Sequence, residues 1–284
     1  MKAKAKVISR FAPSPTGPLH LGHAYSALLA HDMARKAGGQ FLLRIEDIDQ
    51  SRARPHWEAQ IYDDLRWLGI TWDGPVMRQS ERLNIYRETL DKLWQSGFLY
   101  SCTCTRRDIE EAVNAPQEGA AFGPDGLIYP GTCRLSGAPQ PGQPLPDTPL
   151  RLNMLRAAGP CHFTELCKTP NGAQQITSEQ MQRDVGDIVL ARRDMGTSYH
   201  LSVVLDDAAQ GITRVIRGAD LFEATKIHVT LQNLLKLPTP SYCHHRLIRD
   251  DNGKRLAKRD DARAIAKYRQ DGASPEDIRA MVRL

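Results

Sequence analysis

Residues 7–23 read VISRFAPSPTGPLHLGH, and this stretch decides the fold that we predict. Its first five residues, of which Val7, Ile8 and Phe11 are apolar, predict a short buried strand. The prolines and the glycine of residues 12–18 predict a stiff loop. A helical pattern over residues 19–37 follows, and residues 40–45 predict a second strand. A strand, a helix and a strand in this order indicate a right-handed parallel unit.

The rest of the chain alternates helices and strands around one irregular segment. Residues 98–150 carry three cysteines and a proline-rich exit, which indicates an inserted subdomain. Ser274 opens the last helix with a capping-box pattern and a proline at the first helical position. The fold class is therefore α/β, an open parallel sheet with an insertion and a short helical C-terminal end. Helices are predicted over residues 55–68, 80–96, 199–209 and 220–235, and strands over residues 187–191, 213–217 and 242–247.

The composition is that of a globular chain with a mild basic excess. The 284 residues are 41% hydrophobic, which suffices for a sizeable core. The formal net charge of +5 suits a polyanionic partner, although many ordinary proteins carry as much. We find no signal segment and no run of about 18 apolar residues, so we expect a cytoplasmic protein without a membrane span. The six cysteines are then expected to be free thiols or metal ligands rather than disulfides.

A candidate phosphate site lies at the start of the first helix. His20 and His23 flank Gly22 there, just after the proline-rich loop. A helix N-terminus presents free N–H groups and a partial positive charge, which attract phosphate. A Walker A loop is a poor alternative because His23 stands where lysine is required, and the G-x-G-x-x-G pattern is absent. Two histidines on a first turn are also often merely solvated.

Charged side chains follow the first two predicted strands. Arg10 and Ser14 come at the end of the first strand, and Glu46 directly follows the second. In an open parallel sheet, ligands bind beyond the carboxyl ends of the strands, so these residues should share one crevice. A guanidinium favours a carboxylate, and Glu46 suits an ammonium group. The alternative is that Glu46 and Arg217 are surface ion-pair residues.

Five ordered motifs resemble the catalytic region of class I glutamyl-tRNA synthetases. The first is RFAPSPTGPLHLGH at residues 10–23, which contains the histidine element through which that family handles ATP. The resemblance covers nearly the whole chain. The other motifs are RIEDID at 44–49, QSER at 79–82, YHL at 199–201 and VIRGAD at 215–220.

The resemblance implies a set of site residues. The sequence leaves open whether Arg10 or Arg217 takes the glutamate side-chain carboxylate, with a preference for Arg10. The glutamate-binding positions are Arg10, Phe11, Ala12, Pro13, Ser14, Glu46, Tyr199 and Arg217. The ATP-binding positions are His20, Gly22, His23 and Lys258, of which His20, His23 and Lys258 are the catalytic ones.

Lys258 belongs to the stretch RLAKR at residues 255–259, which resembles the mobile lysine signature of the family. The stretch departs from that signature at Ala257 and at Arg255, where arginine replaces a lysine but keeps the charge. Lys258 would neutralise the charge that builds on the leaving pyrophosphate. A solvated basic turn is the alternative.

The insertion carries a candidate metal site. Three thiols can supply a tetrahedral zinc site that lacks one ligand. Resemblance to one branch of the family implies Tyr129 as the fourth ligand and one structural Zn²⁺ per chain, while Cys161 and His162 compete for that position. Three reduced structural cysteines are the alternative. The three thiols belong to Cys102, Cys104 and Cys133.

The resemblance divides the chain into four parts. Residues 1–97 and 151–240 are expected to form the two halves of a Rossmann-like catalytic domain, the second with an acceptor-side region. Residues 98–150 are the zinc-bearing insertion, and residues 241–284 hold the lysine signature and C-terminal helices. Few residues follow that signature, so we expect no anticodon-binding domain.

The short C-terminal part resembles the truncated branch of the family, which attaches L-glutamate to the modified wobble base queuosine of tRNA(Asp). The resemblance implies a ligase that forms glutamyl-adenylate from ATP with Mg²⁺, without needing tRNA, and then transfers glutamate to queuosine-bearing tRNA(Asp). A split glutamyl-tRNA synthetase that charges the tRNA 3′ end and a non-catalytic RNA-binding relative remain as alternatives. We expect a monomer and no membrane partner.

Overall fold

The computed structural model describes residues 6–114, 121–168, 171–249 and 263–284. Lys258 and the rest of the lysine signature lie outside the described residues. No helix in these four ranges is both long and apolar enough to cross a membrane. In chain order the first elements are β1 (Ile8–Phe11), α1 (Leu21–Lys36), β2 (Gln40–Ile45), α2 (Pro55–Trp67), β3 (Met77–Arg78), the 3-10 turn η1 (Gln79–Arg82), α3 (Leu83–Gln95), β4 (Leu99–Ser101), α4 (Arg106–Asn114), β5 (Phe122–Gly123) and β6 (Gly126–Leu127). The later elements are β7 (Leu150–Leu152), α5 (Met154–Ala157), β8 (Cys161–Glu165), β9 (Gly172–Ile176), α6 (Ser178–Asp184), β10 (Val189–Ala191), α7 (Tyr199–Ala209), β11 (Arg214–Gly218), the 3-10 turn η2 (Ala219–Leu221), α8 (Ala224–Leu234), β12 (Ser241–His245), α9 (Ile265–Gln270) and α10 (Pro275–Val282).

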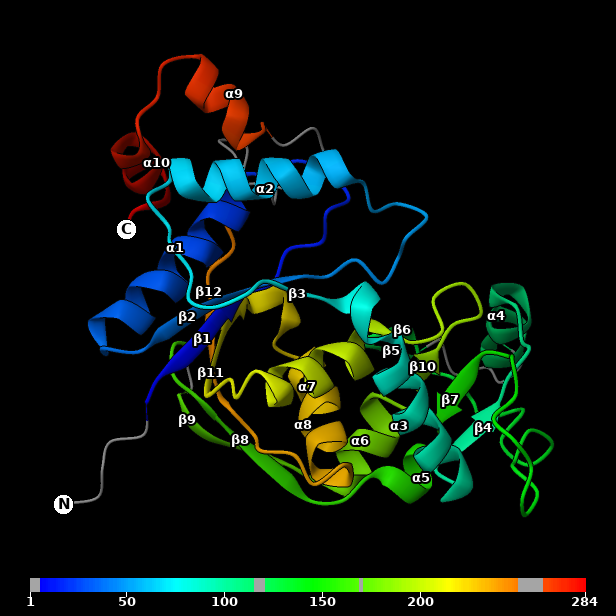
Figure 1. Ribbon diagram of the computed structural model, residues 1–284. Helices are drawn as coiled ribbons and strands as arrows, with labels where there is room; N and C mark the ends of the chain where they lie inside the picture. The colour runs from blue at the N-terminus through cyan, green and yellow to red at the C-terminus, as the bar shows by residue number, and fades with distance from the viewer. Residues whose placement is uncertain (1–5, 115–120, 169–170, 250–262) are drawn as a thin grey trace.

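A largely parallel sheet organises the catalytic fold (Figure 1). The predicted first unit is confirmed, because β1 pairs with β2 in parallel from Ile8 opposite Gln40 onward. Strands β3, β2 and β1 form its first section, and β1 adjoins the second section at β11, where the Thr213 N–H donates to the Ile8 carbonyl at 2.9 Å. Beyond β11 the order is β12, β8 and β9, and only β9 runs antiparallel to its neighbour.

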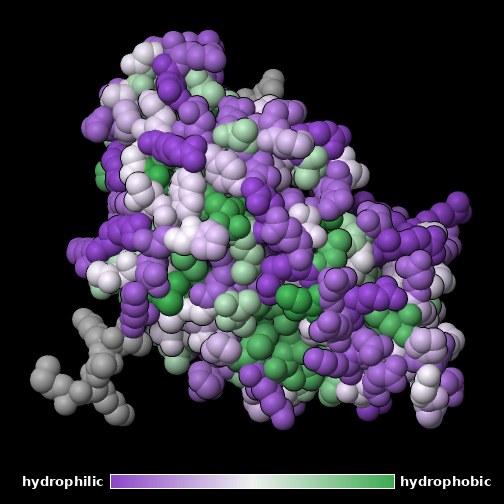
Figure 2. All heavy atoms as spheres, viewed as in Figure 1, coloured by the Kyte–Doolittle hydropathy of each residue, from purple (hydrophilic) through white to green (hydrophobic). Residues whose placement is uncertain are grey.

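Each face of this sheet is covered by a separate core. Val215 packs against α7 and α8, whereas its neighbour Ile216 packs against α1 and β2. Side chains alternate between faces along a strand, so consecutive residues of β11 serve opposite cores. Figure 1 shows α1 and α2 on one side of these strands and α7 and α8 on the other. Hydrophilic residues cover most of the face drawn in Figure 2.

Helix ends follow local signals in the sequence. Ser274 caps α10 and exchanges hydrogen bonds with Asp277, as the capping-box pattern predicts. The predicted helix over residues 220–235 begins later than expected, because the chain first makes the turn η2 and enters α8 only at Ala224. The helices α4, α5 and α6 and the β8–β9 hairpin were not predicted, since their short segments carry no extended periodic pattern.

The inserted region has a sheet of its own. Strand β7 lies between β4 and β10 and pairs antiparallel with both. The strand predicted over residues 187–191 forms only over Val189–Ala191, and it joins this small sheet instead of the parallel one. The hairpin of β5 and β6 pairs Phe122 with Leu127.

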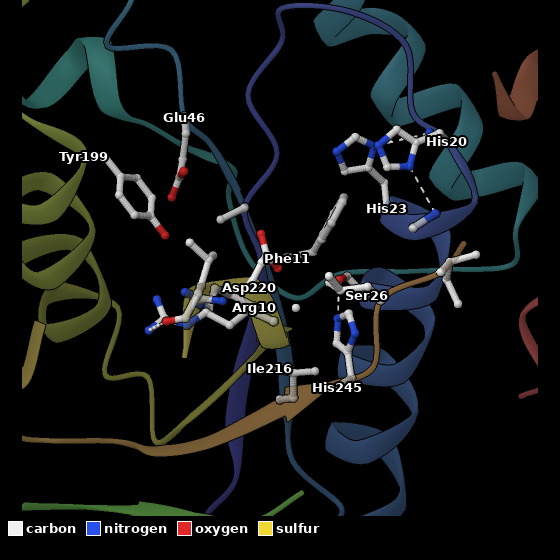
Figure 3. Close-up of a pocket in the computed structure, with 17 residues that line it drawn as sticks. Arg10, Phe11, His20, His23, Ser26, Glu46, Tyr199, Ile216, Asp220 and His245 are labelled. Atoms are coloured by element: carbon white, nitrogen blue, oxygen red, sulfur yellow. Dashed lines mark hydrogen bonds between the residues drawn. The ribbon is translucent and has the colours of Figure 1, made fainter. Parts of the chain in front are cut away.

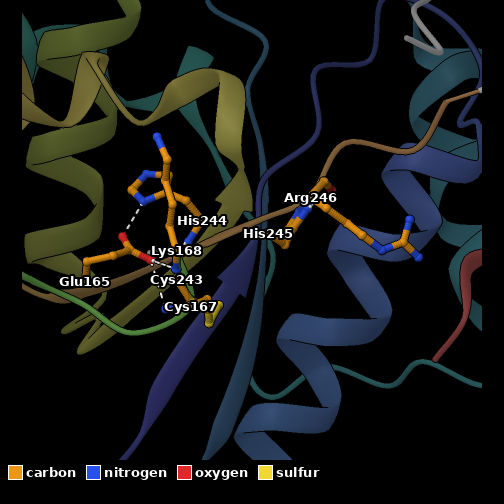
Figure 4. Close-up of a disulfide and its surroundings, with 7 residues drawn as sticks. All are labelled: Glu165, Cys167, Lys168, Cys243, His244, His245 and Arg246. Carbon is orange, nitrogen blue, oxygen red and sulfur yellow. Dashed lines mark hydrogen bonds and ion pairs between the residues drawn. A yellow bond between two sulfur atoms is a disulfide. The ribbon is translucent and has the colours of Figure 1, made fainter. Parts of the chain in front are cut away.

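The expectation that the cysteines form no disulfide is wrong, because Cys167 and Cys243 are bonded to each other (Figure 4). Strand β8 pairs in parallel with β12 through Glu165 and Tyr242, and this pairing brings the two thiols together from 76 residues apart. Their Cα atoms lie 4.8 Å apart, within the range that a disulfide requires. The sequence could not reveal this pair, because only the strand order places β8 beside β12.

Candidate active site

A cavity of about 350 Å³ opens at the carboxyl ends of β1, β2 and β11 (Figure 3). Nine of the predicted site residues line it. Pro13 is not among them, but its carbonyl accepts the Glu46 N–H at 3.0 Å. Ser14 lines a neighbouring pocket that shares Glu46 and Tyr199 with the main cavity. The nine residues are Arg10, Phe11, Ala12, His20, Gly22, His23, Glu46, Tyr199 and Arg217.

The side chains in the cavity form two groups. In Figure 3, Arg10, Glu46 and Tyr199 lie at one end, and His20 and His23 lie at the other, at the tip of α1. The phenyl ring of Phe11 lies between them. One end thus offers charged partners for a small polar molecule, and the other offers a helix N-terminus.

Arg10 is held by an acid that sequence reasoning missed. Its Nε donates to Asp207 Oδ1 at 3.0 Å and its Nη2 donates to Oδ2 at 3.3 Å, which is a two-pronged pair. Asp207 Oδ1 also accepts from Arg44 Nη1 at 2.8 Å. Burial alone would raise the pKa of Asp207, but the guanidiniums of Arg10 and Arg44 lower it below its ordinary value. The carboxylate therefore stays ionised between two cations.

Two acidic residues line the cavity, the exposed Asp220 and the largely buried Glu46. Glu46 Oε1 accepts from Arg44 Nη2 at 3.2 Å, and the Glu46 side chain is only 10% exposed. Burial raises the pKa of Glu46 despite the nearby guanidiniums of Arg44 and Arg10. An ammonium group bound in the cavity would favour the ionised form of this carboxyl group.

Arg217 is buried at the end of β11 and has neutral partners. Its Nη2 donates to Thr225 Oγ1 at 2.7 Å and to the Leu221 carbonyl at 3.3 Å. Its Nε and Nη1 contact His244 and His228. Among the described residues no carboxylate pairs with Arg217, in contrast to Arg10, so its charge is available to an anion in the cavity.

His20 and His23 are joined in the N-terminal cap of α1. His20 Nδ1 accepts from the Gly22 N–H at 3.1 Å, and His23 Nδ1 accepts from the His20 N–H at 3.2 Å. The two rings stack with their centroids 3.8 Å apart. His20 is thus the cap itself, not a first-turn residue. Gly22 leaves room for the cap, because a Cβ there would lie 3.0 Å from His20 Cε1.

The two described flanks of the lysine signature lie at this same end. Ile248 lines the cavity on one side of residues 250–262. On the other side, Ala264 forms a bridge with His20, and the Ile265 N–H donates to the Leu19 carbonyl at 2.8 Å.

A cysteine cluster stands apart from the cavity, in the inserted region. The sulfur atoms of Cys102, Cys104 and Cys133 all lie within 4.8 Å of one another. The Tyr129 hydroxyl lies 3.4 Å from the first sulfur and 3.3 Å from the second, and it accepts the Cys133 N–H at 3.0 Å. Three sulfurs and one oxygen around a common centre match the donor set of a tetrahedral metal site.

Arg151 supplies positive charge to this cluster. Its Nε donates to Cys102 Sγ at 3.3 Å, and its guanidinium lies 4.0 Å from the centre of the Tyr129 ring. A cation beside these groups favours their anionic, ligating forms. The competing ligands lie elsewhere, because Cys161 and His162 belong to β8 and Cys161 Sγ contacts Thr230.

Comparisons with known proteins agree with this geometry. The description "tRNA synthetases class I (E and Q), catalytic domain" matches residues 6–138 and 145–284. A glutamyl-Q tRNA(Asp) synthetase from Rhodobacter capsulatus is 69% identical over 278 residues, which are 98% of this chain and 100% of the relative. One from Nocardia farcinica is 42% identical and aligns over 96% of this chain and 82% of its own length.

Among solved structures, a glutamate tRNA ligase from Elizabethkingia meningosepticum, in complex with its amino acid, aligns with a TM-score of 0.74 and 29% identity. The alignment covers 95% of this chain and 59% of that chain. The chain therefore covers less than two thirds of the length of that ligase.

Proposed function

The chain belongs to the family of class I tRNA synthetases (E and Q), whose members are ligases, and from this premise we propose that it activates L-glutamate with ATP and transfers it to queuosine of tRNA(Asp). The observation that carries the proposal is the 69% identity to a glutamyl-Q tRNA(Asp) synthetase along that relative's whole length. The cavity is consistent with it, because acidic and basic groups face one end and a helix N-terminus faces the other.

We assign the glutamate side-chain carboxylate to Arg217 rather than to Arg10. Asp207 already compensates Arg10, whereas the described partners of Arg217 are neutral and leave its full charge to the ligand. Glu46 then receives the ammonium group, and Tyr199 contributes a hydroxyl from the start of α7. This arrangement reverses the preference for Arg10 that follows from the sequence alone.

Selectivity for glutamate over glutamine follows from the same assignment. A glutamine side chain would leave the buried Arg217 without a counter-charge. Sites built around a buried polar contact reject an analogue that lacks it by about 10⁴-fold. The chain should therefore catalyse ATP–pyrophosphate exchange with glutamate and hardly at all with glutamine, and equal rates would disprove the assignment.

ATP is assigned to the tip of α1, where His20 and His23 donate to its phosphates and Gly22 allows close approach. The reaction needs no nucleophilic side chain. The glutamate carboxylate attacks the α-phosphate of ATP, pyrophosphate leaves, and a hydroxyl of the acceptor then displaces AMP from the mixed anhydride. Mg²⁺ would accompany ATP as part of this substrate and screen the phosphate charge.

Lys258 is assigned to the leaving pyrophosphate. Ile248 and Ala264 flank its segment and lie at the nucleotide end of the cavity. Lys258→Ala should lower the adenylation rate by about 10²–10³-fold, because a charge-stabilising contact in the transition state is lost. Pre-steady-state formation of glutamyl-adenylate measures this rate, and a near-normal rate would remove Lys258 from the mechanism.

The cysteine cluster is assigned one structural Zn²⁺, held by Tyr129 and the three thiolates of Cys102, Cys104 and Cys133. These donors fit the metal in number and chemistry. The ion would tie the start of the insertion at Cys102 to its later part at Cys133. We infer no step of the reaction through it.

Glutamate transfer to queuosine-containing and queuosine-lacking tRNA(Asp) tests the proposed acceptor. Transfer should occur only to the modified tRNA, and the product should keep a free 3′ terminus. Charging of the tRNA 3′ end would instead favour a split glutamyl-tRNA synthetase, and a chain without pyrophosphate exchange would favour a non-catalytic relative.

A further inference from the structure

Arg217 is held between two histidines that none of the motifs above includes. Its Nε donates to His244 Nε2 at 3.2 Å, and its Nη1 lies 2.9 Å from His228 Nδ1. A guanidinium N–H can only donate, so both ring nitrogens must accept. Each histidine, if neutral, then carries its proton on the opposite ring nitrogen.

The first histidine begins a relay that leaves the cavity. His228 Nε2 lies 3.1 Å from His200 Nδ1, and His200 Nε2 lies 3.3 Å from Asp125 Oδ1. With its proton on Nε2, His228 donates to His200 Nδ1. His200 then carries its proton on Nε2 and donates to the carboxylate of Asp125. Asp125 lies in the turn between β5 and β6, so this relay joins Arg217 to the inserted region.

The second relay ends within the parallel sheet (Figure 4). His244 Nδ1 lies 2.6 Å from Glu165 Oε2, and the carboxylate is fully buried. Glu165 Oε1 also accepts the backbone N–H groups of Cys167, Lys168 and His244. This carboxylate is thus held in place at the point where the disulfide joins β8 to β12.

We propose that His228 and His244 are positioning residues for substrate recognition, which orient Arg217 through two relays that end on Asp125 and Glu165. The inference rests on the proposed function only in naming the ligand of Arg217 as the side-chain carboxylate of glutamate. The relays keep the two carboxylates away from the guanidinium. They therefore align Arg217 without neutralising it.

Electrostatics support neutral histidines at both positions. An imidazolium would direct an N–H at the guanidinium of Arg217, and the two positive charges would repel each other. Burial and the charge of Arg217 lower the pKa of His228 well below its ordinary value. The same two causes lower the pKa of His244 to about 4, although Glu165 acts in the opposite direction. Both rings can thus accept from Arg217 at neutral pH.

Substitutions at position 228 test whether Arg217 needs the acceptor that begins the first relay. His228→Leu removes the acceptor, whereas His228→Asn places an amide oxygen near the position of Nδ1. In pyrophosphate exchange, His228→Leu should raise the glutamate KM by roughly 10–100-fold, because a charged donor loses its partner. His228→Asn should stay within about threefold of the unsubstituted chain, as should the ATP KM of both variants. Substitution of His56, exposed on α2, is the matched control.

Substitutions at position 244 test the acceptor that begins the second relay in the same way. His244→Gln keeps an acceptor near Nε2, and His244→Leu does not. Thermal unfolding of each variant confirms that it is folded. The proposal is overturned if the amide variants are as impaired as the leucine variants, or if the ATP KM rises together with the glutamate KM.

The protonation states can be measured without any activity. In ¹⁵N-labelled full-length chain, NMR should report His228 and His200 protonated on Nε2, His244 protonated on Nδ1, and no titration of His228 or His244 between pH 6 and 8. The opposite tautomers would refute the relays even if exchange is normal. If the unsubstituted chain shows no glutamate-dependent exchange but the expected tautomers, the proposed function fails and the relays stand.

Discussion

Asp207→Asn should destabilise the fold and weaken glutamate binding together. The carboxylate of Asp207 lies between Arg10 and Arg44, at 3.0 and 2.8 Å from their nearest nitrogens. Both arginines are buried, with 5% and 0% of their surface exposed. The amide keeps the shape of the side chain but removes its charge, so two guanidiniums lose their shared counter-ion.

The size of the expected loss of folding stability follows from the burial of these side chains. Removal of one partner from a buried ion pair costs about 3–5 kcal/mol, because the remaining charge cannot be solvated. The loss should fall in the lower part of that range, since Arg44 keeps Glu46 and the asparagine oxygen can still accept one N–H bond. Arg10 loses its two-pronged partner and its fixed orientation. The glutamate KM should therefore rise by at least about tenfold.

Asp206→Asn is the matched control, because this residue is adjacent in α7 and also buried, does not line the cavity, and approaches Arg44 only at 3.9 Å without contacting Arg10. Asp206 accepts from Gln79, Arg82 and Tyr86. Its substitution should destabilise the fold comparably, yet leave the glutamate KM within about threefold. Urea unfolding followed by tryptophan fluorescence gives the stability, and pyrophosphate exchange gives the KM.

The pH dependence provides an internal check. The pKa of Asp207 is lowered by folding, so its contribution is complete above its unfolded pKa of about 4 and is lost as the pH falls through the folded value. The stability gap between the unsubstituted chain and Asp207→Asn should therefore narrow below about pH 4. A gap of less than about 1 kcal/mol at pH 7, or equal KM changes in the two variants, would refute this account of the site.

Three further predictions concern other parts of the molecule. The purified chain should contain one zinc by elemental analysis and lose it in a Cys102→Ser/Cys104→Ser double variant; metal-free folded protein would exclude the site. Burial raises the pKa of Asp64 to about 7. Ionisation of this buried carboxyl group then lowers the stability of the fold as the pH rises. Asp64→Asn should therefore stabilise the fold by about 2–4 kcal/mol at pH 8 and by less than about 1 kcal/mol at pH 4, as measured by urea unfolding. Thiol titration of denatured, unreduced and metal-free protein should give four thiols, since Cys167 and Cys243 are bonded; six thiols would contradict the disulfide.

Local sequence pattern was sufficient for the elements around the cavity. The helix predicted over residues 199–209 forms with those bounds, and so does the strand over 40–45, because each carries a periodic apolar pattern between clear breaks. Arg10 and Glu46 meet because parallel strands present their carboxyl ends at one edge of the sheet. This rule depends only on the direction of the strands, which the order of helices and strands in the sequence predicts.

The partners of these residues depended on tertiary structure. Asp207 reaches Arg10 from 197 positions away, and His244 reaches Arg217 only because β12 pairs with β11. Such contacts depend on how α7 docks and on the order of the strands, and neither leaves a local signal in the chain. The amino-acid pattern thus identified groups that can hold a carboxylate. Packing alone decided which arginine keeps its charge for a ligand, since charge compensation inside a protein depends on the neighbours that the fold supplies.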